Sequence, residues 1–389
     1  MVYRYPHYYR RFHCIASDCS DTCCASWEIG IDGKSLERYR HVPGLLGNRL
    51  HNSIDWRRHS FRQYEGRCEF LNEEKLCDLY TELGEKGFCR ACRLYPRHIE
   101  EFEGVREVSL CLSCIEAARI ILETEEPVRF LTKETDREET YEDFDAALYR
   151  TLMNARTQIM EILQDRATDE RTRMGLSLLL AHDLQRRIRG DRLSETDSLL
   201  ERYRRSDRTV SFAKKMTACE PGGSNRYETM KALYGVMERM PGLKPEWPQR
   251  RSRMKAELYG NGREDYAARR RRFLQSDAGA RMPLLCEQLM GYWVFAYFCG
   301  AVYDRNAYGK MKFAVACTLL IEDMCQAIWQ ENGETLVHAE IVDIAHQFSR
   351  EIEHVDENRE LLERALTRDI RLGIRVLLCA VWDRADLLP

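Results

Sequence analysis

Cysteine is concentrated near the start of this chain. Ten of its 16 cysteines lie between positions 14 and 114 of a 389-residue sequence. They occur in close groups: Cys14, Cys19, Cys23 and Cys24; Cys68 and Cys77; Cys89 and Cys92; Cys111 and Cys114. Thiolates repel one another when they are collected in one place. Such a density therefore indicates either a disulfide framework or a metal that the sulfurs share.

The redox compartment decides between these two interpretations. The first residues, MVYRYPHYYRRFHC, include no apolar stretch of the kind that a secretory signal requires. The most apolar segment, residues 289–303, is shorter than the ~20 residues that cross a bilayer. We therefore expect a cytoplasmic protein with no membrane span. Its thiols stay reduced in that compartment, which favours a metal over disulfides.

The spacing of the cysteines indicates more than one simple zinc site. The two Cys-x-x-Cys pairs, Cys89/Cys92 and Cys111/Cys114, would suffice for one four-thiolate site. The adjacent Cys23 and Cys24 do not easily converge on one small tetrahedral ion, and they suit a larger cluster or two separate sites. We predict that all ten grouped cysteines are metal ligands, although some of them alternatively have structural or catalytic roles. Six isolated cysteines are predicted to be small buried apolar residues: Cys219, Cys286, Cys299, Cys317, Cys325 and Cys379.

Beyond Pro127 the sequence changes character. No proline occurs from 128 to 220, and apolar residues recur at helical spacing. We predict a mainly α fold, in which a small irregular cysteine-rich metal-cluster module (1–120) packs on a large all-helical domain (121–389). Turn-rich segments at 220–225 and 241–245 indicate a sub-boundary near 220–250. Helices are predicted over 141–163, 170–188, 263–275, 283–303, 310–329, 338–354 and 358–380, and the best strand candidate is Val105–Leu110.

The charge distribution limits the possible partners. The net charge is −3, and the first 120 residues carry 18 basic and 18 acidic side chains. A metal module that binds nucleic acid is usually strongly basic, so we expect no nucleic-acid partner. The clearly basic segment, 250–272, is predicted to be a solvated helix face, with a docking strip for an acidic protein surface as the alternative. No pattern specifies an oligomeric state.

Longer motifs around the thiols resemble known families. The segments CEFL at 68–71, LCDLY at 76–80 and CRACRLYPR at 89–97 resemble the zinc- or iron-chelating domain of the YkgJ type. The opening segments YRRFHCIASDC at 9–19 and DTCCASWEIGID at 21–32, with SREIEHVDEN at 349–358, resemble the bacterial flagellin lysine-N-methylases of the FliB family. These matches lie at both ends, so the resemblance extends over the whole chain.

The resemblance implies methyl transfer from S-adenosylmethionine to lysine side chains of flagellin. It also implies a [4Fe–4S] cluster in the cysteine-rich part, with zinc as the alternative metal. The sequence lacks the glycine-rich turn after a strand that Rossmann-type methyltransferases use, because Gly260-Asn261-Gly262 follows no apolar strand. It also lacks the Cys-x-x-x-Cys-x-x-Cys spacing of radical enzymes, since position 26 is serine. The donor pocket is therefore not placed by any motif.

The segment 349–358 supplies the candidate catalytic residues. If it is helical, Glu351 and His354 lie three residues apart on one face, where they can attract a lysine ammonium and accept its proton. The alternative is that both belong to a hydrogen-bond network at the helix end. The aromatic residues of 292–303 form either a cage for an alkylated ammonium or, as we expect, part of the core.

Two other function classes compete with the methyltransferase interpretation. In one, the cysteine block is a metal-handling or metal-sensing device and the helices are its scaffold. In the other, a structural zinc module is attached to a helical protein-interaction domain. The size of the helical domain is more than a simple chelating protein needs, which favours an enzyme.

Overall fold

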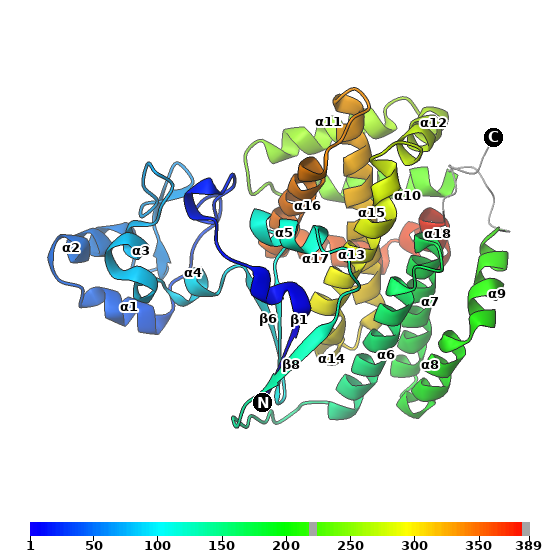
Figure 1. Ribbon diagram of the computed structural model, residues 1–389, viewed down its shortest axis with the longest axis horizontal. Helices are drawn as coiled ribbons and strands as arrows, with labels where there is room; N and C mark the ends of the chain where they lie inside the picture. The colour runs from blue at the N-terminus through cyan, green and yellow to red at the C-terminus, as the bar shows by residue number, and fades with distance from the viewer. Residues whose placement is uncertain (218–223, 383–389) are drawn as a thin grey trace.

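The computed structural model describes residues 1–217 and 224–382 and shows a mainly α-helical protein (Figure 1). A small module lies at one end of the molecule, and a large helical part with one sheet along its side forms the rest. Cys219 and most of the predicted turn at 220–225 lie outside the described residues. Within those residues, no helix combines the length and the apolar character needed to cross a bilayer.

The small module has its own apolar core. Leu50, Ile54 and Phe70 are fully buried in it, together with Cys68 and Cys89. Its short elements leave much of the backbone in turns, as the sequence predicts for this region. The elements are α1 (Gly33–Arg40), α2 (Gly44–Ser53), β2 (Ile54–Asp55), β3 (Ser60–Phe61), β4 (Gln63–Tyr64), β5 (Arg67–Cys68), α3 (Asp78–Leu83), a 3₁₀ turn (Gly84–Gly87) and α4 (Arg90–Leu94).

A four-stranded sheet connects the module to the helices. Its order is β6 (Arg97–Phe102), β7 (Val105–Leu110), β1 (Val2–Pro6) and β8 (Phe130–Glu134). β1 runs parallel to β7 with Val2 opposite Val105, and the other neighbours are antiparallel. The predicted strand at 105–110 is confirmed. The sheet draws strands from both sides of residue 120, and the domain division at that position stays a prediction.

The helical part begins at α5 (Ile115–Leu122). Side chains cap several of its helices: Asp145 accepts from the N–H of Leu148 at 2.9 Å, and Asp169 accepts from that of Thr172 at 3.0 Å. The helices that follow are α6 (Ala146–Gln164), α7 (Glu170–Arg189), α8 (Thr196–Arg204), α9 (Ser206–Thr217), α10 (Ser224–Met237), α11 (Trp247–Tyr259), α12 (Arg263–Leu274), α13 (Met282–Tyr297), α14 (Ala301–Asp304), α15 (Ala307–Glu331), α16 (His338–Glu353), α17 (Asp356–Arg368) and α18 (Ile374–Val381). Further 3₁₀ turns lie at His7–Arg11, Ala16–Asp18, Leu193–Glu195, Gly279–Arg281, Phe298–Gly300 and Ile370–Leu372.

Most predicted helices are confirmed, and two are too long. The predicted helix 358–380 is interrupted, because Asp369 accepts from the N–H of Arg371 and starts a 3₁₀ turn before α18. The predicted helix 283–303 ends at Tyr297, where a 3₁₀ turn separates α13 from α14. The turn predicted at 241–245 is present between α10 and α11.

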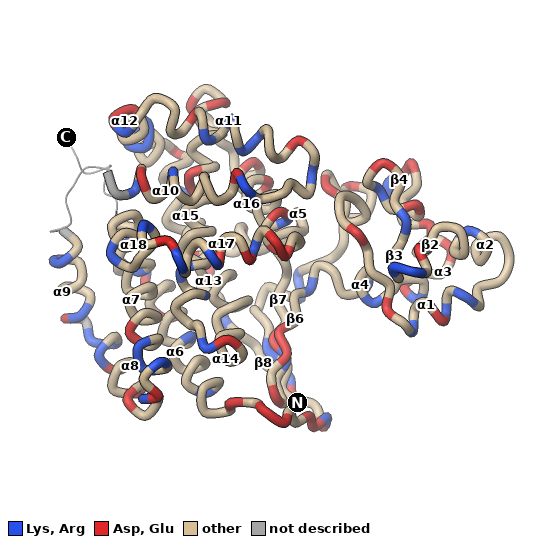
Figure 2. The backbone as a smooth tube through the Cα atoms, turned by 180° about the vertical axis from the view of Figure 1, so that it is seen from behind, with Lys and Arg blue, Asp and Glu red and all other residues tan. Residues whose placement is uncertain are grey.

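Helices α13 and α15 form the centre of the helical part and are buried on nearly every side. Within this core lies a group of ionised side chains. Arg226 donates to Asp323 at 2.6 Å and to Glu322 at 2.8 Å, and Arg270 donates to Glu322 at 3.0 Å. The expectation of a solvated face over 250–272 is therefore wrong for Arg270, which is fully buried. Residues 250–272 carry nine basic and three acidic side chains, and both kinds are seen on α12 in Figure 2.

The buried carboxylate of Asp323 is expected to contribute strongly to stability. It also accepts a hydrogen bond from Tyr259 at 2.6 Å, so Asp323→Ala would remove one of the two carboxylates that pair with the buried guanidinium of Arg226 and would take this acceptor from the buried hydroxyl of Tyr259. We expect a loss of about 3–5 kcal/mol in the free energy of unfolding, measured by urea denaturation. Glu360→Ala, which removes an exposed pair with Arg364, should cost about 0.5 kcal/mol or less. Equal stability of the two variants would contradict this role of Asp323.

Candidate functional site

The ten grouped cysteines lie in the small module and at its junction with the helical part, and none forms a disulfide. Cys68 and Cys89 are in the module core, and Cys24, Cys77 and Cys92 pack against it. The remaining five lie toward the helical part: Cys14, Cys19 and Cys23 on the loop after β1, and Cys111 and Cys114 between β7 and α5.

Two of these thiols are poised to ionise. A hydrogen bond from Cys23 lowers the pKa of Cys24 to about 7, and a hydrogen bond from Cys92 lowers the pKa of Cys89 to about 7. The thiol that donates in each pair has a pKa raised above its usual range. The thiolate is the form of cysteine that binds metal. In each pair, the cysteine with the lowered pKa is therefore the one that ionises more readily.

The donor set suits zinc or an iron–sulfur cluster, since both prefer thiolate sulfur. Over residues 1–217 and 224–382, however, no three Cys, His, Asp or Glu side chains converge in the arrangement that holds a metal ion. The predicted ligands lie in neighbouring loops and elements, but their side chains do not meet at one point. Their assignment as metal ligands stays a prediction.

A single carboxylate fastens the thiol-bearing loop to the helical part. Asp21, between Cys19 and Cys23, lies 2.6 Å from Lys244 Nζ, 2.9 Å from His346 Nε2 and 2.9 Å from Arg350 Nη1. Burial alone would raise the pKa of Asp21. The hydrogen bond from His346 and the charges of Arg350 and Lys244 outweigh burial and hold that pKa well below its usual range.

Arg350 extends this attachment. Its guanidinium donates to the carbonyl of Ala25 at 2.8 Å and lies over the Trp27 ring, 4.1 Å from its centroid. On the same indole packs the imidazole of His354, with ring centroids 4.5 Å apart. The loop that carries the adjacent cysteines is thus held against the C-terminal end of α16.

His354 reaches the second cysteine pair. Its Nε2 lies 2.6 Å from the hydroxyl of Ser113, which stands between Cys111 and Cys114. Burial lowers the pKa of His354, so the imidazole is neutral at neutral pH and can accept a proton. The structure therefore places this predicted catalytic residue beside the predicted metal ligands.

Glu351 faces other partners. Its carboxylate accepts from the backbone N–H groups of Leu243 at 2.7 Å and Lys244 at 3.3 Å, while Asn358 donates to its carbonyl at 2.8 Å. Burial raises the pKa of Glu351 despite these donors. The bond from Asn358 is of the helix-end kind that the sequence offered as the alternative, whereas Leu243 and Lys244 belong to a distant loop, and Glu351 and His354 share none of these partners. A catalytic role for Glu351 stays a prediction.

Sequence reasoning missed Glu353. Its carboxylate accepts hydrogen bonds from the hydroxyls of Tyr292, at 2.6 Å, Tyr297 and Ser349. Tyr292 and Tyr297 belong to the aromatic run on α13, most of which is buried core as expected, although Tyr303 is exposed. Two tyrosines five residues apart in an apolar segment, each with a hydroxyl that needs a partner when buried, were the signal for a polar partner.

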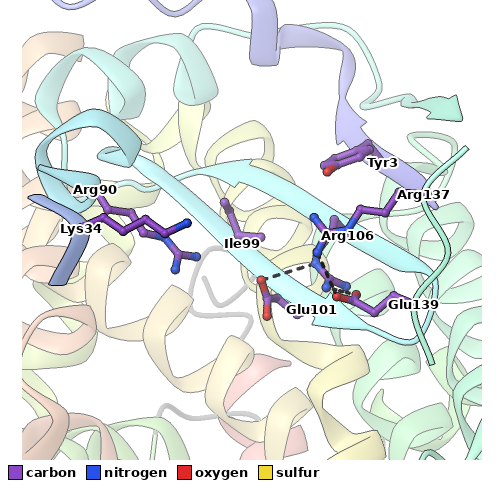
Figure 3. Close-up of a pocket in the computed structure, with 8 residues that line it drawn as sticks. All are labelled: Tyr3, Lys34, Arg90, Ile99, Glu101, Arg106, Arg137 and Glu139. Atoms are coloured by element: carbon purple, nitrogen blue, oxygen red, sulfur yellow. Dashed lines mark hydrogen bonds and ion pairs between the residues drawn. The ribbon is translucent and has the colours of Figure 1, made fainter. Parts of the chain in front are cut away.

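A cleft of about 550 Å³ lies between the module and the sheet (Figure 3). Lys34 and Arg90 lie together at one end of it and make no ion pair with any residue in the described ranges. At the other end, Arg106 is paired with Glu101 and Glu139. The module side of the cleft therefore presents two unpaired cations to any anionic group that enters. Its other lining residues are Tyr3, Ile99 and Arg137.

Comparison with known proteins adds independent information. The model of the FliB lysine N-methylase C-terminal domain matches residues 156–372, more than half of the chain. A lysine-N-methylase of Salmonella typhimurium is 28% identical over 130 residues, which cover 30% of this chain and 31% of that protein. The flagellar biosynthetic protein FliU of Salmonella muenchen is 27% identical over 126 residues, which cover 30% of this chain and 75% of that protein.

The match thus covers about a third of the length of the Salmonella typhimurium methylase. No solved structure matches this chain. The resemblance of the cysteine block to the YkgJ-type domain stays a prediction.

The attachment through Asp21 leads to a pH-dependent prediction. Because the folded-state pKa of Asp21 lies below the unfolded value of about 3.9, its stabilisation is complete above that value and is lost as the pH falls through the folded-state pKa. Asp21→Asn should lower the free energy of unfolding by about 3 kcal/mol at pH 7, measured by urea denaturation. The difference from wild type should shrink progressively below about pH 4.

Asp277→Asn, at an exposed position, is the matched control and should change stability little at either pH. A constant difference between Asp21→Asn and wild type from pH 7 down to pH 2 would contradict the charged role of Asp21.

Proposed function

This chain belongs to the FliB lysine N-methylase family, and on that premise we propose that it transfers methyl groups from S-adenosylmethionine to lysine side chains of flagellin. The family match over 156–372 is the observation that carries the proposal. The names of the relatives support both the proposed lysine methylation and the proposed flagellar substrate, since one relative is a lysine-N-methylase and another is a flagellar biosynthetic protein.

The cofactor in this proposal is a [4Fe–4S] cluster on cysteines of the N-terminal block, with zinc as the alternative. If bound there, the cluster would supply iron to which the methyl donor could bind. The ten thiols supply the sulfur donors that such a cluster or a zinc ion requires. Asp21 holds the loop with Cys19 and Cys23 at the helical part.

Methylation requires a neutral lysine amine. The reference pKa of lysine is about 10.4, so at neutral pH the amine must lose a proton before its nitrogen can attack. The new bond joins the lysine nitrogen to the methyl carbon as the sulfonium–methyl bond breaks, and the donor leaves as a neutral thioether. Positioning and a route for one proton are therefore what the protein must provide.

His354 is the side chain best placed to take that proton. It is neutral because burial lowers its pKa, and it lies at the loop of Cys111 and Cys114 through its contact with Ser113. The carboxylate of Glu353 lies close enough to raise the pKa of His354 against the effect of burial, and so favours the protonated imidazole that forms. Tyr292 and Tyr297 fix the orientation of that carboxylate.

The direct test is to incubate the purified, metal-loaded chain anaerobically with flagellin, a reductant and methyl-labelled S-adenosylmethionine. We expect label on flagellin lysines, detected by peptide mass spectrometry. No label on lysine, with the metal content confirmed, would exclude the methylase function and leave a metal-handling or scaffold role.

A variant tests the proton acceptor. His354→Gln should lower the methylation rate by about 10²-fold or more, because it removes the general base, while the iron content and the melting temperature stay near those of wild type. The matched control is His41→Gln, since His41 is exposed on the small module and should leave the rate unchanged. A wild-type rate for His354→Gln would show that another group accepts the proton.

A further inference from the structure

The cleft between the small module and the sheet has one face of the sheet as its floor (Figure 3). Arg106 on β7 lies opposite Glu101 on β6 and opposite Tyr3 on β1. Residues that lie opposite each other in a sheet point to the same face. Ile99 is two residues before Glu101 on β6, so it points to that face as well. The strands therefore supply one side of the cleft, and the module supplies the other.

Asp32 holds the two cations of the module beside each other. One of its carboxylate oxygens accepts from the N–H of Ser35 at 3.0 Å and caps α1. The other accepts from the N–H of Arg90, at the start of α4, at 2.8 Å. Lys34 lies in the first turn of α1, and its side chain and that of Arg90 come together at one end of the cleft (Figure 3). Both residues are exposed, and within residues 1–217 and 224–382 neither of them makes an ion pair.

The charges at the other end of the cleft are already balanced. Glu139 accepts a hydrogen bond from Arg106, and its Oε1 lies 3.4 Å from Arg137 Nη2. Glu101 Oε1 lies 3.4 Å from Arg106 Nε. Four cations and two carboxylates line the cleft, so two positive charges are in excess, and both are at the module end. Like charges side by side repel each other, and an anionic group between them removes that repulsion.

The size of the cleft favours a ligand larger than one small anion. Its volume of about 550 Å³ falls among pockets of roughly 300–1,000 Å³, which hold organic ligands of many atoms. The apolar side chain of Ile99 lies between the two charged ends (Figure 3). A lone carboxylate would occupy only the module end. A peptide with acidic side chains would place a carboxylate there and extend along the floor over Ile99.

The floor strand also leads away from the candidate catalytic residue. β6 begins two residues after Tyr95, and the ring centroids of Tyr95 and His354 are 5.8 Å apart. Ile99 is four residues after Tyr95, and four residues of chain span at most ~14 Å. A protein chain bound in the cleft therefore needs a spacer of only a few residues to place a lysine at His354.

We propose that this cleft binds an acidic segment of the protein substrate, whose carboxylates pair with Lys34 and Arg90. The identity of the ligand as substrate rests on the proposed function. The segment docks away from the lysine that is methylated, so its contacts are the same before and during methyl transfer. Such contacts lower KM and leave kcat unchanged.

The binding test uses a fluorescein-labelled decapeptide of alternating glutamate and alanine, with fluorescence anisotropy as the readout. The full chain should bind it, and a peptide with glutamine in place of every glutamate should bind at least about tenfold more weakly. Lys34→Glu/Arg90→Glu should also weaken binding at least about tenfold, because two attractive contacts become repulsive. Lys34→Gln/Arg90→Gln, which only removes the charges, should have an intermediate effect. The affinity of wild type should fall as the salt concentration rises.

The matched control is Arg58→Glu/Lys75→Glu. It reverses one arginine and one lysine that are exposed on the module and are not among the residues that line the cleft. Its affinity should stay within about twofold of wild type. Equal affinities of this control and of Lys34→Glu/Arg90→Glu would overturn the proposal, as would a wild-type chain that does not bind the acidic peptide. Free glutamate that displaces the labelled peptide as well as the unlabelled peptide does would show a small-anion site and overturn the peptide as the occupant.

Methylation kinetics on the same variants separate this inference from the proposed activity. Lys34→Glu/Arg90→Glu should raise the KM for flagellin about tenfold and leave kcat near that of wild type. An unchanged KM in an active enzyme refutes only the docking site. A wild-type chain that binds the acidic peptide but labels no lysine refutes only the methylase function.

Discussion

The interaction on which the candidate site depends is the contact of the Asp21 carboxylate with three basic side chains. Lys244, His346 and Arg350 come from the loop after α10 and from α16, yet all three meet one side chain in the loop of the adjacent cysteines. A partly buried carboxylate with three cationic or donating partners is costly to leave unpaired, as is each buried base. The position of the thiol loop on the helical part is therefore set by charge as much as by apolar packing.

From this attachment the rest of the site follows in order. Arg350 holds the backbone after the adjacent cysteines and one face of Trp27, and His354 packs on the same indole. His354 in turn contacts Ser113, so that the loop of Cys111 and Cys114 is brought to the loop of Cys23 and Cys24. The sheet also brings the two loops together. β1 leads into the loop of Cys23 and Cys24, β7 leads into the loop of Cys111 and Cys114, and these two strands are parallel neighbours.

Local patterns predicted much of this fold. The confirmed helices are those with long apolar periodicity, such as α15, and the strand at 105–110 was the best short strand candidate in the sequence. The pairing of that strand with β1 could not be predicted, because its partner lies about 100 residues away and nothing in either segment specifies the other. The predicted helices 283–303 and 358–380 are each interrupted by a single 3₁₀ turn. The spacing of apolar residues does not reveal such short interruptions.

The site was predicted less completely than the fold. Motif spacing identified the cysteines, and the resemblance to a family identified His354. Asp21 and Glu353 escaped notice because each is an ordinary acidic residue in sequence and acquires its partners only when distant elements pack together. The central claim is our proposal that a metal bound by the N-terminal cysteines lies beside His354, which contacts Ser113. Anomalous diffraction at the iron edge, from crystals of the metal-loaded chain grown anaerobically, tests it most directly. We predict an iron peak among the N-terminal cysteines, next to Ser113 and His354; iron located only far from His354, or no iron peak at all, would contradict the account.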